Sequence, residues 1–271
     1  MNTKVAIIAV YFGALPKYFY LFKHTAIYNK DYNWLIFTDQ VSEIIKENNI
    51  TFIPYTLSLY NKRLSTIFNK HIEIKEKNRI CEGRPAFAKI FEEYLDDYDW
   101  WGWTDLDLLN GNFNNFINDD IFNNYDAINV TVTTIHKGRT AFNGPLMLIS
   151  MKLKYLYKQI TDYELKLING NPGGRYNSFN MEEKDFYDVF VKNDLKLYQG
   201  KKIGNYLIPI FRYGKRRLPV RWVNGNIEIL SYIEDYPTSY VKNFGCDSMM
   251  YHFPKNYNNI ILHSNNLIEI N

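Results

Sequence analysis

The sequence predicts a doubly wound α/β fold, in which a mostly parallel central sheet is flanked by helices. Apolar strands alternate with helical segments over the first ~55 residues, as in βαβ units. The first strand is a continuous apolar run from Val5 to Val10, typical of a strand buried on both faces. Since 46% of the 271 residues are hydrophobic, the chain can fill one core, and we expect one domain with a C-terminal elaboration.

The elements of the N-terminal part follow from their apolar patterns and from the residues that break them. Gly13 and Pro16 end the first strand. We expect, in order, strand Lys4–Phe12, helix Pro16–Tyr28, strand Trp34–Phe37, helix Ser42–Asn48, strand Ile50–Tyr55 and helix Leu57–Lys70. The charged stretch Lys70–Arg79 is interpreted as a solvated face. A helix then opens at Arg84-Pro85, with Phe87, Ile90, Phe91 and Leu95 as its buried stripe.

The remaining elements are predicted in the same way. We expect strand Tyr125–Val130, a polar loop, strand Phe142–Ser150, an amphipathic helix Lys152–Ile168, a Gly/Pro/Asn loop Asn169–Ser178 and a helix Met181–Val191. Asn224-Gly225 signals a hairpin within Arg221–Ile229. Residues 256–271 are expected to form a peripheral tail or a last strand.

Composition excludes several classes. The net charge of +3 is too modest for a dedicated nucleic-acid binder. The two cysteines, Cys81 and Cys246, form no disulfide framework and are expected to be free thiols in a reducing compartment. The sequence contains no signal-peptide pattern and no run of 18 apolar residues. We therefore expect a cytoplasmic protein.

The most informative stretch is Tyr98–Gly111, where the aromatic strand Trp100–Thr104 leads into Asp105 and Asp107. The two carboxylates share one face, but in a regular strand their Cα atoms lie about 6.6 Å apart, too far to hold one ion. Either the chain bends at Asp107, or Asp107 binds a divalent metal while Asp105 binds a ribose hydroxyl or a metal-bound water. Oxygen ligands suit Mn²⁺ or Mg²⁺ rather than zinc.

Asp-x-Asp after an apolar strand resembles the metal motif of GT-A glycosyltransferases. The wider pattern resembles a group of bacterial glycosyltransferases of polysaccharide biosynthesis clusters and spans nearly the whole chain. It comprises Arg84-Pro85-Ala86-Phe87, Tyr98–Gly111, Phe142-Asn143-Gly144-Pro145, Glu182-Glu183, Arg221-Trp222-Val223-Asn224-Gly225 and His252-Phe253-Pro254-Lys255.

The resemblance implies a single GT-A-like, Rossmann-type domain over 1–271, with a nucleotide-binding half (1–111) and an acceptor side with the elaboration (112–271). It implies Mn²⁺- or Mg²⁺-dependent transfer of a sugar from a nucleotide-sugar donor, with UDP as the expected nucleotide. The acceptor would be a glycan or lipid-linked saccharide in the synthesis of capsule or lipopolysaccharide.

Donor-binding candidates lie where ligands bind in such sheets, at the carboxyl ends of strands. Tyr11, with Phe12 and Gly13 beside it, would stack on the base, and Asp39 would accept a hydrogen bond from base or ribose. Alternatively Tyr11 packs in the core and Asp39 caps the next helix. Arg84 would reach the diphosphate, or form a surface ion pair. Asn143 and Gly144 would face the donor sugar, or form a plain turn.

The resemblance also implies the catalytic groups. His252 would complete the metal site with Asp105 and Asp107, or it is instead a structural histidine. Lys255 would bind the diphosphate. Glu183, with Glu182 and Asp185 behind it, would be the general base of an inverting enzyme. In a retaining enzyme Glu183 would only orient the sugar, and carboxylates at a helix start can simply stabilise the helix.

Three alternatives stay open. The basic stretch Lys201–Arg217 would contact an anionic acceptor or the inner face of the cytoplasmic membrane, or is a solvated loop. The chain could instead be a catalytically inactive sugar-binding subunit of a polysaccharide assembly complex. A nucleotidyltransferase is disfavoured, because the glycine-rich phosphate loop of that class is reduced here to Gly13.

Overall fold

The computed structural model describes residues 2–129, 132–135, 139–142, 144–169, 183–199, 220–223, 226–229, 250–252, 260–263 and 267–270. Its strands are β1 (Val5–Tyr11), β2 (Tyr32–Thr38), β3 (Ile45–Glu47), β4 (Ile50–Pro54), β5 (Trp100–Thr104), β6 (Leu108–Asn110), β7 (Ala127–Asn129), β8 (Val132–Ile135), β9 (Arg139–Phe142), β10 (Leu146–Ser150), β11 (Leu197–Gln199), β12 (Val220–Val223), β13 (Asn226–Ile229), β14 (Met250–His252), β15 (Ile260–His263) and β16 (Leu267–Ile270). Its α-helices are α1 (Phe19–Tyr28), α2 (Leu57–Phe68), α3 (Phe87–Ile90), α4 (Asp119–Asn124), α5 (Tyr163–Asn169) and α7 (Lys184–Lys192). Its 3₁₀ segments are η1 (Lys77–Ala86), η2 (Glu92–Tyr94), η3 (Phe113–Asn115), η4 (Met151–Leu153) and η5 (Leu156–Gln159).

The central sheet is mostly parallel, as predicted. Its strand order is β11-β7-β10-β5-β1-β2-β4-β3, and only β3 and β10 run against the other strands. β1 is central because its apolar run Val5–Ala9 is buried on both faces. The α/β fold class is therefore confirmed.

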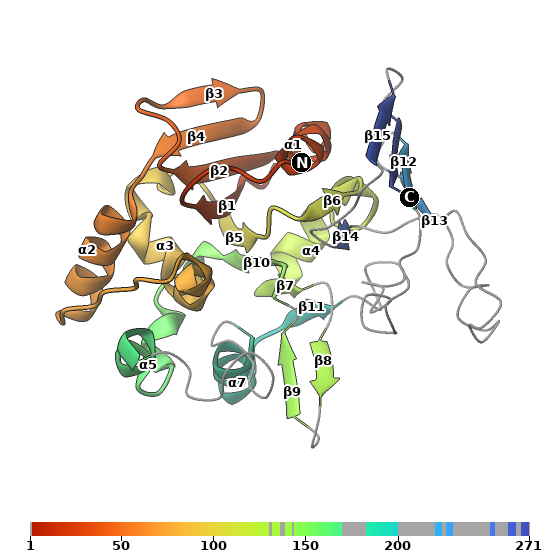
Figure 1. The fold of residues 1–271 in the computed structure, drawn as a ribbon. Coiled ribbons are helices and arrows are strands. Elements are labelled where there is room, and N and C mark those ends of the chain that lie inside the picture. The colour runs from red at the N-terminus through yellow and green to blue at the C-terminus, as the bar shows by residue number, and fades with distance from the viewer. Residues whose placement is uncertain are drawn as a thin grey trace.

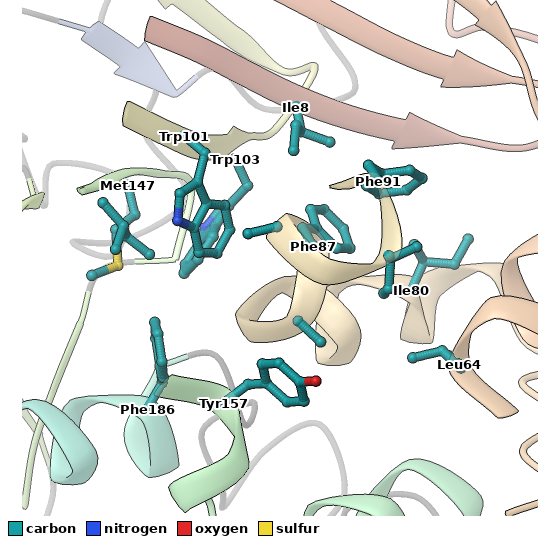
Figure 2. Close-up of a cluster of buried hydrophobic side chains, with 14 of the residues drawn as sticks. Ile8, Leu64, Ile80, Phe87, Phe91, Trp101, Trp103, Met147, Tyr157 and Phe186 are labelled. Carbon is teal, nitrogen blue, oxygen red and sulfur yellow. The ribbon is translucent and has the colours of Figure 1, made fainter. Parts of the chain in front are cut away.

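Each face of this sheet carries its own core, because side chains alternate along β1. Ala6 and Ile8 point into a cluster with side chains of α2, α3, α5 and α7, which lie together on one side of the sheet (Figure 1). Figure 2 shows the centre of this cluster, where Trp101 and Trp103 of β5 face Phe87 of α3. Val5, Ile7 and Ala9 point the other way, into a cluster with α1, α4 and η3.

Two predicted helices are wrong. Residues 42–48 contain β3, which pairs antiparallel with β4, because Asn48 adopts a left-handed φ of 56° and closes a tight turn. The predicted helix Lys152–Ile168 is divided into η4, η5 and α5, and Asp162, with a φ of 51°, separates the last two. The helix predicted from Arg84 is divided into the end of η1, α3 and η2, but its expected stripe of Phe87, Ile90, Phe91 and Leu95 is buried.

The C-terminal part forms a second, antiparallel sheet with the order β13-β12-β16-β15. The predicted hairpin at Asn224-Gly225 is confirmed, since Val223 of β12 pairs with Asn226 of β13. β14 does not belong to this sheet and pairs with β6. The strands of the second sheet lie beside α1 and β6, at the right of Figure 1. Among the described residues, no helix has the length and apolar character needed to cross a membrane.

Candidate active site

The order of strands predicts that a ligand would bind at the carboxyl ends of β1, β2 and β5. The chain proceeds from β1 to β2 and β4 on one side, and then places β5 on the opposite side of β1. Ligands of open α/β sheets bind at such a reversal, outside the carboxyl ends of the strands. Tyr11, Thr38 and Thr104 are the last residues of these three strands.

The two carboxylates lie at this edge, where the chain passes from one sheet to another. β5 ends at Thr104, and β6, which starts at Leu108, pairs outside the central sheet. Between them the side chain of Leu106 is buried, the side chain of Asp105 is 28% exposed, and Asp107 is only 6% exposed. A carboxylate buried to this extent needs compensating donors or a cation. One expectation from the sequence was that the chain bends at Asp107. The chain bends in the link between β5 and β6, which contains Asp107.

Arg84 holds Asp105 in place. Its guanidinium forms an ion pair with the Asp105 carboxylate and donates a second hydrogen bond, of 3.1 Å, to the Gly144 carbonyl. The same carbonyl accepts a 2.8 Å hydrogen bond from Trp103 Nε1. In this structure the side chain of Arg84 therefore orients one of the two carboxylates, and it is neither a solvated surface group nor a plain surface ion pair, since it is only 12% exposed.

Glu183 lies against the same loop. A Cβ placed on Gly144 would come within 2.8 Å of Glu183 Oε1, so a glycine is needed there for the carboxylate to approach. Phe142 N also donates to the Glu183 carbonyl over 3.1 Å. The structure thus brings Glu183 and Gly144 to the Arg84–Asp105 pair. It does not bring Asp185, which is ion-paired with Lys166 Nζ at 2.8 Å.

A second polar group stands at the ends of β1 and β2. Gly13, with a φ of 90°, donates its amide to Asp39 Oδ1 over 2.7 Å, and Gln40 Nε2 donates to the same oxygen over 2.8 Å. The hydrogen bond from Gln40, then the Gly13 amide and the charge of Lys77, lower the pKa of Asp39. The next element after Asp39 is the strand β3, so the alternative of a helix cap is wrong.

Lys77 belongs to this group, although the sequence pattern assigned it to a solvated face. Its ammonium lies 2.9 Å from the position that a Cβ on Gly13 would occupy. Because η1 runs from Lys77 to Ala86, it carries Lys77 to the end of β1 and Arg84 to the end of β5. One segment thus supplies a cation at the carboxyl end of each of these two strands.

The aromatic candidates divide between core and site. The side chain of Phe12 is 4% exposed and packs edge-on against Tyr60, so it belongs to the core. Tyr11 is half-buried. Tyr18, which the sequence pattern did not single out, lies near the two carboxylates and Tyr11. Burial raises the pKa of its hydroxyl, and the charges of Asp107, Tyr11 and Asp105 raise it further. The sequence signal for Tyr18 is only its place just after the break at Gly13 and Pro16.

The register of β14 places the backbone of His252 near that of Asp107. β14 and β6 are antiparallel, and His252 pairs with Leu108, the residue that follows Asp107. Asn143, Glu182, Lys255 and the stretch Lys201–Arg217 lie outside the described residues. Among the side chains that the structure describes, which do not include that of His252, no three His, Cys, Asp or Glu form a metal cluster. The described donors are therefore the two carboxylates, which are hard oxygen ligands that fit Mn²⁺ or Mg²⁺.

A family model described as "Family of unknown function (DUF6625)" matches residues 7–205. The chain belongs to this family. The DUF6625 match covers the central sheet, Asp105, Asp107 and Glu183, and it ends before β12 and β14. No curated protein sequence matches the chain.

Several solved structures to which this DUF6625 chain is similar are glycosyltransferases. One is an active-site mutant of LgtC, 12% identical, with a TM-score of 0.47 over 93% of this chain and 87% of that one. Another is involved in glycosylation of the major capsid of PBCV-1, 13% identical, with a TM-score of 0.39 over 72% and 80%. A third is GlyE of Streptococcus pneumoniae TIGR4, 12% identical, with a TM-score of 0.39 over 74% and 46%. At these identities and TM-scores, nothing about the reaction of this chain follows from the likenesses.

Proposed function

We propose that this chain is a metal-dependent glycosyltransferase that moves a sugar from a UDP-sugar to a saccharide or lipid-linked oligosaccharide acceptor in bacterial surface polysaccharide synthesis. The observation that supports the proposal is the antiparallel pairing of β6 with β14, in which His252 lies opposite Leu108, the residue that follows the buried Asp107. Two carboxylates and an imidazole at the ligand-binding edge of an α/β sheet suit a divalent cation and an anionic ligand.

In this proposal Asp107, Asp105 and His252 hold Mn²⁺ or Mg²⁺. When bound, the ion supplies Lewis-acid neutralisation of the charge that develops on the leaving diphosphate. Arg84 keeps Asp105 oriented through its ion pair and through the Gly144 carbonyl. Lys255, which follows His252 closely in sequence, adds positive charge for the diphosphate.

Glu183 is the proposed general base if the enzyme inverts the anomeric configuration, because its carboxylate lies against Gly144 beside the Arg84–Asp105 pair. If the enzyme retains configuration, Glu183 orients the donor sugar, together with Asn143 and Gly144. Glu182 precedes it in the sequence, whereas Asp185 is ion-paired with Lys166 and has no role in this proposal. We further propose that Lys201–Arg217 contacts the acceptor or the inner face of the cytoplasmic membrane.

The test of this function is release of the free nucleotide (UDP, GDP or CMP) from a panel of nucleotide sugars, since glycosyltransferases hydrolyse their donors slowly without an acceptor. The full chain is incubated with UDP-glucose, UDP-galactose, GDP-mannose and CMP-sialic acid, with MnCl₂ or with EDTA. We expect UDP to be released from a UDP-sugar in the presence of MnCl₂ and not in the presence of EDTA. Binding of a UDP-sugar without any turnover would favour the inactive sugar-binding subunit. In a parallel reaction with UTP and a sugar 1-phosphate, formation of a UDP-sugar and diphosphate would favour a nucleotidyltransferase.

The pair of Asp39 and Lys77 should select the base, with Tyr11 stacked on it. A carboxylate that accepts and an ammonium that donates match a ring N–H beside a carbonyl, which uracil and guanine offer and cytosine and adenine do not. We expect Asp39→Asn to weaken UDP binding by about 10-fold or more relative to CDP, because a charged hydrogen bond contributes about 1.5–3 kcal/mol. Lys77→Met should weaken UDP binding comparably.

The measurement is competition of UDP and CDP for the Mn²⁺-loaded protein. Lys75→Met is the matched control, because Lys75 is an exposed lysine two residues away that is ion-paired with Glu73 at 3.6 Å. If Asp39→Asn and Lys77→Met leave the ratio of UDP to CDP affinity unchanged, the base does not bind at this pair.

A further inference from the structure

Trp222 joins the C-terminal sheet to the strand that follows the two carboxylates. It lies in β12, its side chain is fully buried, and its ring packs edge-on against His24 at 5.2 Å and Tyr28 at 5.3 Å, both on α1. Its Nε1 donates a 2.7 Å hydrogen bond to the carbonyl of Asn110, the last residue of β6.

β6 is held at its far end by a set of such contacts. The Asn110 amide donates to Thr25 Oγ1 over 3.1 Å, and Asn29 Nδ2 donates to the Gly111 carbonyl over 2.8 Å. Thr25 and Asn29 belong to α1 and its C-terminal cap. The three residues of β6 are therefore fixed by α1 and Trp222 at one end, and they carry Asp107 at the other.

The position of β14 is set by its pairing with the same strand, β6. Met250 pairs with Asn110, and His252 pairs with Leu108. The positions of Asp107 and His252 thus both depend on where β6 lies, and the indole of Trp222 contacts β6 at the residue that pairs with the start of β14.

We propose that Trp222 is a positioning residue for the metal site: its indole N–H fixes β6, and through β6 it fixes the positions of Asp107 and His252 relative to Asp105, which is held separately by Arg84 and the Pro145 carbonyl. This inference rests on the proposed function, because it assumes that Asp107 and His252 bind a metal. It gives the second sheet, which lies beyond the DUF6625 match, a role in metal affinity. Residues that orient metal ligands from outside the coordination sphere typically change affinity by 10–100-fold when replaced.

The experiment measures the Kd of Mn²⁺ alone and of Mn²⁺ with UDP, by electron paramagnetic resonance of the free ion, for the wild type and for Trp222→Phe. Phenylalanine keeps a ring against α1 and removes the N–H. Trp34→Phe is the matched control, because Trp34 is also fully buried and packs edge-on against Phe22 of α1 at 5.4 Å. Its Nε1 has no hydrogen-bond partner in the described part of the chain.

We expect Trp222→Phe to raise the Kd of Mn²⁺ about 10-fold and Trp34→Phe to leave it unchanged, both measured well below the Tm of each variant. Equal Kd values for wild type and Trp222→Phe, or an equal increase in both variants, would overturn the inference while the proposed function stands. No Mn²⁺ binding by the wild type would instead overturn the proposed function and this inference with it.

If Trp222→Phe does not fold, Tyr28→Leu replaces it, because this variant removes one ring that holds the indole and leaves β12 unchanged. A weaker Mn²⁺ affinity in Tyr28→Leu, with Trp34→Phe unchanged, supports the inference, and an unchanged affinity overturns it.

Discussion

Replacing Asp107 with asparagine should lower Mn²⁺-dependent hydrolysis of the donor by about 10³-fold or more. Asparagine has nearly the same volume, so the side chain, which is 6% exposed, still fits. The substitution removes the negative charge that a divalent cation needs, and metal stabilisation of a developing diphosphate contributes several kcal/mol to the barrier. The measurement is release of UDP from the UDP-sugar that the wild type prefers.

The control is Asp120→Asn, the same chemical change on the exposed face of α4, which should leave the rate unchanged. Asp105→Asn should have an intermediate effect, because it loses one carboxylate and also frees Arg84 from its ion pair. If Asp107→Asn keeps the wild-type rate and folds normally, Asp107 does not bind a catalytic metal.

Replacing Gly102 with alanine should destabilise the whole fold. A Cβ at Gly102 would lie 2.0 Å from the carbonyl oxygen of Met147 and 2.8 Å from Leu148 Cδ2. Gly102 of β5 pairs with Leu148 of β10, so the clash is with the backbone of the neighbouring strand and no side-chain rotation relieves it. We expect the free energy of unfolding to fall by about 3 kcal/mol, the upper part of the range for overpacked cores, as measured by chemical denaturation.

Ser150→Ala is the control for Gly102→Ala, because Ser150 is a buried residue of the same strand pair and alanine adds no atom there. It should change the free energy of unfolding by less than about 1 kcal/mol. A Gly102→Ala variant with wild-type stability would mean that β5 and β10 do not pair in the register described here. The placement of Asp105 would then be wrong as well, because Asp105 N donates to the Pro145 carbonyl over 2.8 Å.

The strands that position the site could be predicted from local pattern. β1, β2, β4 and β5 are short apolar or aromatic runs bounded by turn residues. Their length and composition favour buried strands over helices. The place of Asp105 and Asp107 at a strand end follows from the same pattern. The helix expected at 42–48 is wrong because Asn48 adopts a left-handed φ and closes a turn between β3 and β4. No local sequence signal distinguishes such a hairpin turn from the end of a helix.

The cation near Gly13 could not be predicted, because η1 has neither helical nor strand periodicity. Its charged residues therefore look like a solvated segment, and only the fold shows that Lys77 and Arg84 reach different strands of one sheet. In the same way, the contact between Glu183 and Gly144 joins α7 to the loop before β10, which no local pattern encodes.

The measurement that tests the central proposal most directly is isothermal titration of the wild-type chain with UDP and with GDP, each with and without Mn²⁺. We expect UDP binding that requires Mn²⁺ and that is lost in Asp107→Ala. If neither nucleotide binds in the presence or absence of Mn²⁺, the proposal of a metal-dependent glycosyltransferase is contradicted, and the carboxylates at the end of β5 serve another purpose.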